Sequence, residues 1–295
     1  MKNLWVLPGV VYMLLSCSSA DHSLTYRDVS EDFKNYWYAG VAELNRYELH
    51  QARYGEIHKG DAVLIFVSED FLQDKQVKYE GRPTDEEIVS VLKLNFTRKF
   101  NTGIYPYSMM SSIFTPISTI APTFKTTTTS QEWCGHTFSQ LNYRDGSYEG
   151  ILSSYFESEA DQQFTLGKTL LEDELWNLIR LEPEQLPIGN IQLILGSQFL
   201  RMKHIPTRIE NANATLESIV DEAFGNISSY RVVYQNIDRA LEIKFEQDFP
   251  HGIVAWSESS DDLTTIATLT HQLNSPYWSQ NNVADSVYRQ QLGLE

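Results

Sequence analysis

The sequence has 295 residues, of which 39 are acidic and 23 basic, so its formal net charge is −16. Such a surface repels polyanions, and its densest basic patch is only Arg98-Lys99. Because neutralising phosphates requires a basic stripe, this composition argues against a nucleic-acid partner. With 42% hydrophobic residues, a chain of this length can bury a large core without disulfides.

The N-terminus has the layout of an export signal. Lys2 precedes an apolar run over residues 4–15, and small residues follow from Ser16 to Ala20. The run is shorter than the roughly 20 residues that a helix needs to cross a bilayer. We therefore expect a secretory signal over residues 1–16 and no permanent membrane span.

The end of this signal resembles a bacterial lipobox. Leu14, Leu15 and Ser16 precede Cys17, whose sulfur would receive the lipid. Residues 17–30 would then form a lipidated tether, and Ser18 and Ser19 behind the cysteine favour an outer-membrane lipoprotein that faces the periplasm. The alternative is ordinary cleavage after Ala20, which releases a soluble protein.

Strand patterns are spread over most of the chain. Residues 62–67 form a short, continuous apolar run, which predicts a strand buried on both faces. Residues 92–97 and 241–246 alternate apolar and polar side chains, which predicts strands with one solvent-exposed face. Residues 191–195 and 252–256 are shorter candidates. Turn signals lie at residues 101–103, 144–146 and 186–189.

Helical patterns are scarce. Leu171, Leu175, Leu178 and Ile179 are spaced for one apolar helix face that ends before Pro183. Weaker candidates cover residues 214–224 and 283–292. Because parallel strands need frequent helical crossovers, many strands with few helices predict a mainly β fold with a curved antiparallel sheet and one or a few short helices. We expect a single β-rich domain over residues 31–295.

Several segments resemble a family of uncharacterised bacterial lipoproteins: residues 36–71, 102–110, 131–136 and 171–176. Members of that family sometimes carry the label "septum formation inhibitor Maf". Maf pyrophosphatases have a Ser-x-Ser-Pro-Arg-Arg loop, whereas the only Ser-Pro here is Ser275-Pro276, followed by Tyr277. The resemblance therefore implies family membership without Maf chemistry. In layout, the family is also similar to periplasmic lipoproteins that fold as half-open barrels around a helix.

One segment brings a nucleophile and a base close together in sequence. In a strand, Cys134 and His136 would share a face with Cβ atoms about 6.5 to 7 Å apart, near the limit for a catalytic pair. Free cysteines are among the most buried residues, and no Lys or Arg lies between Gln131 and Tyr143. We expect Cys134 to pack in the core, and an exported hydrolase is the alternative.

Three acidic residues alternate along one segment. In an extended chain, Glu157, Glu159 and Asp161 would share one face, and a hard cation such as calcium could bind all three carboxylates there. A solvated strand face is the favoured interpretation, because the segment lacks the turn and spacing of a calcium loop. The histidines form no zinc motif, and we predict no cofactor.

An aromatic and methionine-rich segment is the last candidate. It would line an apolar cavity or, as the favoured alternative, pack in the core; its members are Tyr105, Tyr107, Met109, Met110 and Phe114. The sequence thus predicts a non-enzymatic, membrane-anchored envelope lipoprotein that acts in envelope assembly or binds an apolar ligand. Its partners would be the membrane, through the lipid anchor, and an apolar ligand or an envelope protein.

Overall fold

The computed structural model describes Arg27 and residues 29–294. The predicted signal peptide and the predicted lipidation site Cys17 lie outside these residues. Arg27 falls within the predicted tether of residues 17–30. Arg27 is buried there, and its Nη1 donates hydrogen bonds to the backbone carbonyls of Pro116 and Ile117.

The described residues form one 16-stranded sheet in which almost all neighbours are antiparallel. The first strands are β1 (Ala42–Arg53), β2 (Glu56–Leu72), β3 (Val77–Lys78), β4 (Ile88–Thr102), β5 (Tyr105–Pro116), β6 (Lys125–Glu132), β7 (Gly135–Arg144) and β8 (Ser147–Ser154). The remaining strands are β9 (Gln162–Gly167), β10 (Leu170–Leu171), β11 (Gly189–Ile194), β12 (Ile209–Asp221), β13 (Gly225–Tyr234), β14 (Ala240–Glu246), β15 (Ile253–Ser260) and β16 (Leu263–Ser275).

The sheet is curved and open. Its strand order is β10-β11-β12-β13-β14-β15-β16-β1-β2-β4-β5-β6-β7-β8-β9, with β3 paired to β2. The end strands β9 and β10 do not pair with each other, and the short β10–β11 ladder is the parallel one. The prediction of a mainly β fold with a curved antiparallel sheet is confirmed.

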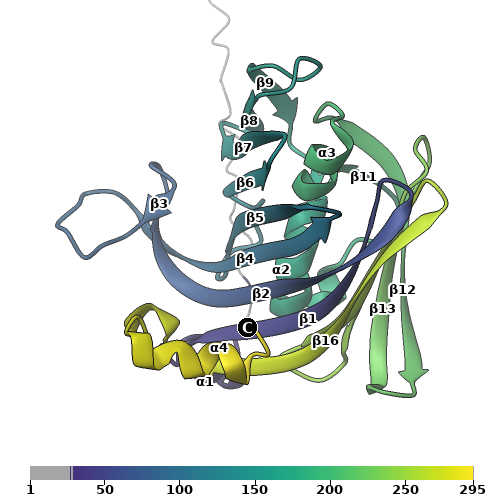
Figure 1. Cartoon of the computed structure of the whole chain (residues 1–295). Helices are drawn as coiled ribbons and strands as arrows, with labels where there is room; N and C mark the ends of the chain where they lie inside the picture. The colour runs from purple at the N-terminus through teal and green to yellow at the C-terminus, as the bar shows by residue number, and fades with distance from the viewer. Residues whose placement is uncertain (1–26, 28, 295) are drawn as a thin grey trace, which may run out of the picture.

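Two of the short helices fill the concave side. The helices are α1 (Glu31–Trp37), α2 (Leu175–Leu181), α3 (Ser197–Lys203) and α4 (Val287–Gln291), with 3-10 turns at Glu172–Glu174, Pro183–Gln185, Tyr277–Ser279 and Val283–Ser286. Figure 1 shows the sheet curling around α2 and α3. Trp176 and Ile179 of α2 and Phe199 of α3 pack in the main hydrophobic core with inward-facing side chains of the strands.

Most predicted elements are present. The apolar run at 62–67 lies inside β2 and is almost wholly buried, and residues 241–246 alternate buried and half-buried in β14. Leu175–Leu181 and the segment Val283–Gln291 are helical as expected. The predicted helix at 214–224 is wrong, because residues 209–221 pair with β11 and β13 as strand β12. Pairing with neighbouring strands there overrides a weak local helix pattern.

Candidate binding cleft at the hairpin end of the sheet

A cleft lies where two hairpins meet the C-terminal end of α3. The β1–β2 and β15–β16 hairpins turn at the same end of the sheet because β16 pairs antiparallel with β1. The cleft has a volume of about 290 Å³ and is lined by Ala52, Arg53, Tyr54, Gly55, Lys203, Ser260, Asp261 and Leu263. A cavity of about 60 Å³ shares most of these residues and adds Gln51, Arg239, Glu258 and Thr265.

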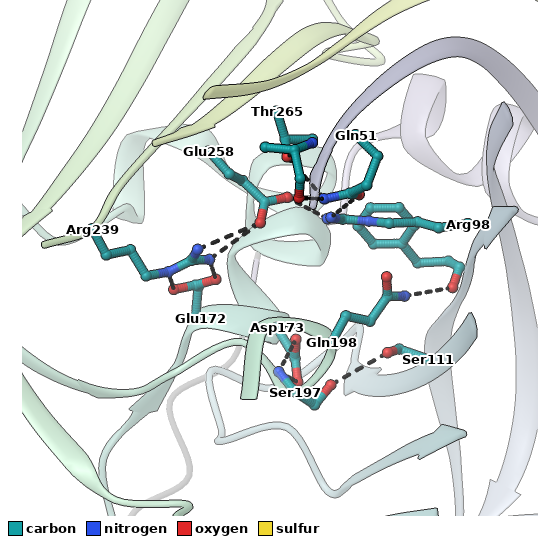
Figure 2. Close-up of polar contacts among 12 residues, drawn as sticks. Gln51, Arg98, Ser111, Glu172, Asp173, Ser197, Gln198, Arg239, Glu258 and Thr265 are labelled. Carbon is teal, nitrogen blue, oxygen red and sulfur yellow. Dashed lines mark hydrogen bonds and ion pairs between the residues drawn. The ribbon is translucent and has the colours of Figure 1, made fainter. Parts of the chain in front are cut away.

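Two buried charged residues, Arg239 and Glu258, line the floor of this cavity, and two more, Glu172 and Arg98, pair with them. Glu258 accepts hydrogen bonds from Arg98 and Arg239, and the Nε of Arg239 donates to Glu172 Oε2 at 3.1 Å. We call these four residues the cleft network; each side chain is less than one tenth exposed. Figure 2 shows Glu258 between the two guanidinium groups. Opposite charges therefore alternate along the floor.

The charged neighbours of Glu258 and Arg239 shift the pKa values of these two residues in favour of their ionised forms. Burial by itself raises the pKa of Glu258, but Arg98 and Arg239 outweigh it and hold that pKa below its usual value. Burial likewise disfavours the charged form of Arg239, yet Glu172 and Glu258 raise its pKa. Two positive and two negative charges compensate each other, so the floor itself offers no net charge to a ligand.

The start of α3 lies next to the network. The backbone N–H of Ser197 donates to both oxygens of Asp173, at 3.1 and 3.2 Å. Burial raises the pKa of Asp173 to about 7, the Ser197 hydrogen bonds oppose this shift, and the nearby charge of Glu172 adds to it. Gly196 is required here because a Cβ would collide with the Glu172 carboxylate.

A smaller space opens behind the network. It measures about 10 Å³ and is lined by Arg98, Gln198 and Trp176 among others. Arg98 Nε, Gln198 Oε1 and the nearby Trp256 Nε1 are buried without a hydrogen-bond partner in the described part of the chain. A space of this size is close to what one water molecule needs, and unpaired polar atoms are what such a molecule would bind.

Arg53 lies at the mouth of the cleft. Its Nη1 donates to the backbone carbonyl of Met202 at the end of α3, and its Nη2 donates to the hydroxyls of Tyr54 at 3.1 Å and Tyr107 at 3.3 Å. Its buried Nε has no partner. Within the described residues, no carboxylate forms an ion pair with Arg53, whereas Lys203 beside it pairs with Asp261. The mouth therefore carries one positive charge without a direct counter-charge.

The predicted core position of Cys134 is wrong. Residues 133 and 134 form the turn between β6 and β7, and the Cys134 thiol is exposed. His136 is also exposed, in β7, and neither side chain has a hydrogen-bond partner among the described residues. A two-residue hairpin turn leaves no sheet neighbour to cover the thiol. The pair therefore has no third group that would orient the histidine for catalysis.

The three acidic residues do not share a strand face. Residues 155–161 form a loop, in which Glu159 is buried and binds Arg201 while Glu157 is exposed. Asp161 accepts a hydrogen bond from the backbone N–H of Ser154. The loop turns these carboxylates apart, and across Arg27 and residues 29–294 no cluster of three or more potential ligands forms a metal site.

The predicted apolar-cavity residues lie on two faces of β5. Tyr107 and Met109 are buried in the main core and Tyr105 packs against it, whereas Met110 is exposed and Phe114 stacks on Phe71. Because strand side chains alternate, the odd and even positions cannot line one cavity. The prediction that this segment packs in the core is confirmed for Tyr107 and Met109, and Tyr105 packs against the same core.

The cleft network escaped our sequence analysis, although strand alternation contains its signal. Leu92, Leu94 and Phe96 point inward, and Arg98 has the same parity in β4. Glu258 shares the parity of Val254 and Trp256 in β15. Following the alternation two residues beyond Phe96 and two beyond Trp256 would have predicted that Arg98 and Glu258 face inward.

Comparison with protein-family profiles and with curated sequences finds no match. Among solved structures, the chain is similar to a beta-barrel-like protein of domain of unknown function DUF1849 from Brucella abortus. The sequence identity is 10%, the TM-score is 0.48, and the match covers 79% of this chain and 98% of that one. Over Arg27 and residues 29–294, helices are too short or too polar to cross a bilayer.

Proposed function

We propose that this protein is an exported, lipid-anchored and non-enzymatic binding protein of the cell envelope that takes a small anionic ligand in the cleft. The observation that carries the ligand class is Arg53, a half-buried residue that lines the cleft and has no carboxylate partner among the described residues. The Nη atoms of Arg53 already donate to Met202, Tyr54 and Tyr107, so its support for an anionic ligand is its positive charge, which strengthens a hydrogen bond to a carboxylate or phosphate. The cleft volume of about 290 Å³ is near the lower end for small-molecule sites.

This proposal changes the expected ligand from apolar to anionic. The concave side of the sheet, where an apolar ligand would lie, is occupied by α2 and α3. The hydrolase alternative gains one supporting feature, the exposed Cys134 thiol, but lacks a contacting base. Attachment at Cys17 and an outer-membrane location facing the periplasm rest on the signal and lipobox pattern of residues 1–20.

The anchor is tested by fractionation of cells. Cys17→Ala should move the protein out of the membrane fraction and abolish palmitate labelling, because a multiply acylated cysteine anchors stably whereas one chain binds only marginally. Palmitate labelling that persists in the variant contradicts the assignment.

The ligand class is tested by thermal unfolding with citrate, succinate and inorganic phosphate. At least one of these anions should raise the unfolding temperature of the wild type. Arg53→Gln should lower the affinity for that anion by about tenfold or more, because the variant loses a charge-assisted hydrogen bond. Arg46→Gln is the matched control, because Arg46 lies on the same strand but pairs with Asp61 outside the cleft. An equal temperature rise in wild type and Arg53→Gln would refute the proposed site.

A further inference from the structure

Four hairpin tips lie side by side at the end of the sheet that carries the cleft. In the strand order β1-β2-β4-β5-β6-β7-β8-β9, every second connection falls at the same end. These connections are residues 54–55, 103–104, 133–134 and 155–161. They therefore form one continuous edge next to the cleft.

Each tip presents a large apolar side chain to solvent. The exposed fractions are 60% for Tyr54, 84% for Ile104, 68% for Trp133 and 76% for Tyr155. Hairpin tips are normally polar, so four exposed apolar side chains along one edge need an explanation. With the neighbouring Tyr105 and Phe156, we call these residues the aromatic rim.

Contacts join the tips into one surface. The rings of Tyr105 and Trp133 lie 6.4 Å apart with an interplanar angle of 27°, and the hydroxyls of Tyr54 and Tyr105 are 3.3 Å apart. Gly135, next to the Trp133 tip, has no Cβ, and a Cβ there would lie 2.9 Å from the Phe156 ring and 3.0 Å from the Tyr155 ring. The glycine therefore lets both rings pack over this hairpin.

The backbone at the first tip is unfavourable for the residue that it carries. Tyr54 has a φ of 54° and Gly55 a φ of 79°, the left-handed pair of a tight hairpin turn. Asn or Gly usually occupies the first of these positions, since a bulky residue there is strained. An aromatic side chain is thus present at this tip despite its local conformational cost.

We propose that the aromatic rim binds an uncharged glycan strand. The C–H faces of sugar rings stack on exposed aromatic rings, and two nearly parallel rings 6.4 Å apart match a ligand with successive flat units. Sugar hydroxyls also need hydrogen-bond partners, which the Tyr54 and Tyr105 hydroxyls can supply. Glu132 and Glu157 flank the rim, and the chain is strongly acidic, so an anionic polymer or anionic bilayer is disfavoured.

The position of the rim relative to the predicted anchor supports the same ligand. Arg27 binds Pro116 and Ile117 at the far end of β5, whereas Tyr105 at the near end belongs to the rim. A strand of 12 residues spans roughly 40 Å, and the ten residues back to Cys17 reach at most about 35 Å. If Cys17 is lipidated, as the proposed function states, the rim faces away from the anchoring membrane. The orientation of the rim relative to the membrane rests on the proposed lipid anchor, whereas the glycan contacts do not.

The test uses the full chain with Cys17→Ala, so that no acyl group contributes to binding. Retention on chitin and cellulose beads and tryptophan fluorescence titration with chitohexaose and cellohexaose measure glycan binding; vesicles of phosphatidylcholine, alone or with phosphatidylglycerol, measure membrane binding. The test variant is Trp133→Ala with Tyr155→Ala. A second variant, Trp133→Phe with Tyr155→Phe, keeps the rings. Trp278→Ala is the matched control, since Trp278 is half exposed at the opposite end of β16.

We expect the wild-type rim to bind at least one glycan, and the double alanine variant to lose about tenfold or more in affinity, as for interface tryptophan and tyrosine residues. The phenylalanine variant should stay within about threefold, and Trp278→Ala should bind as wild type does. All variants should unfold at the wild-type temperature, because the substituted side chains are exposed.

Three results overturn the proposal: no binding of the wild type to any of these glycans, equal binding by the double alanine variant, or Trp133-dependent binding to vesicles in place of glycan. The last result would make the rim a membrane-docking surface. The double alanine variant should leave carboxylate or phosphate binding unchanged, because Trp133 and Tyr155 do not line the cleft. Arg53→Gln should weaken carboxylate or phosphate binding more than glycan binding, since Arg53 contacts Tyr54 of the rim but not Trp133 or Tyr155. Failure of the rim and failure of the cleft are therefore separate outcomes.

Discussion

Two groups of buried ions lie at different places inside the sheet, and they differ in how completely their polar atoms are bonded. Arg180 of α2 and Glu43 of β1 form one group, the sealed pair: both Nη atoms of Arg180 bind the Glu43 carboxylate and its Nε binds the Pro250 carbonyl. The cleft network adjoins two cavities and leaves Arg98 Nε unbonded. Complete bonding indicates a structural connection, and incomplete bonding next to a cavity indicates a site.

Both groups illustrate the same energetic rule. Removing ions from water is costly, and only well-placed partners offset that cost. In the sealed pair, Tyr36 and Asn45 also donate to Glu43, so the carboxylate is bonded from three residues. Losing one partner there should cost more than losing one in the network, where each central ion has two partners.

Glu43→Gln should have the largest effect on stability. Breaking a buried ion pair by removing one partner costs about 3–5 kcal/mol, because the other charge stays buried. Chemical denaturation measures this change. Asp61→Asn is the control, since Asp61 forms a partly exposed pair with Arg46, which should contribute about 1 kcal/mol, less than the buried pair does. Similar losses in the two variants would mean that Arg180 finds another partner.

Glu258→Gln should cost less, about 2–3 kcal/mol, because Arg239 keeps its pair with Glu172. The variant also uncovers positive charge at the cleft floor. Added citrate or phosphate should therefore stabilise Glu258→Gln more than it stabilises wild type, whereas Glu43→Gln should respond as wild type does. An equal response of all three proteins would remove the distinction between the two groups.

Asp173→Asn should change the dependence of stability on pH. The pKa of Asp173 is about 7 in the folded protein and about 3.9 unfolded, so between these values the folded state holds a proton that the unfolded state lacks. The contribution of Asp173 to the free energy of unfolding of the wild type therefore falls as pH rises from 4 to 7. The free energy of unfolding of the variant should equal that of the wild type near pH 4 and exceed it by about 1–2 kcal/mol at pH 8. The gain is limited because the hydrogen bond from Ser197 stabilises the ionised Asp173 of the wild type.

Denaturation curves at pH 4, 6 and 8 measure this difference. The Ser197 backbone N–H and the charge of Glu172 act on residue 173 in both proteins, so the comparison tests the ionisation of this side chain. A difference between variant and wild type that does not vary with pH would show that Asp173 is already ionised at pH 4.

Cys134→Ser should have the smallest effect. The thiol is exposed in a turn, and surface substitutions usually change stability by less than about 0.5 kcal/mol. Iodoacetamide should label the folded wild type at the rate of an exposed thiol, and the unfolding temperature should be unchanged by the substitution. Labelling only after denaturation would place the thiol in the core and contradict the turn geometry.

Local sequence patterns predicted several of the strands and the main helix. Apolar runs and period-two alternation fix which segments become strands, because burial of one face stabilises them wherever they pair. The apolar stripe before Pro183 likewise produced α2. Net charge alone argued against nucleic-acid binding.

The contacts between residues far apart in sequence follow from the tertiary fold. Glu172 and Arg239 are 67 residues apart, and Arg180 and Glu43 are 137 apart, so no local pattern brings them together. Pairing with neighbouring strands also made residues 214–221 a strand, and the hairpin register placed Cys134 in a turn. The cleft and the aromatic rim arise from strand order, since an antiparallel sheet gathers alternate connections at one end regardless of their separation in sequence.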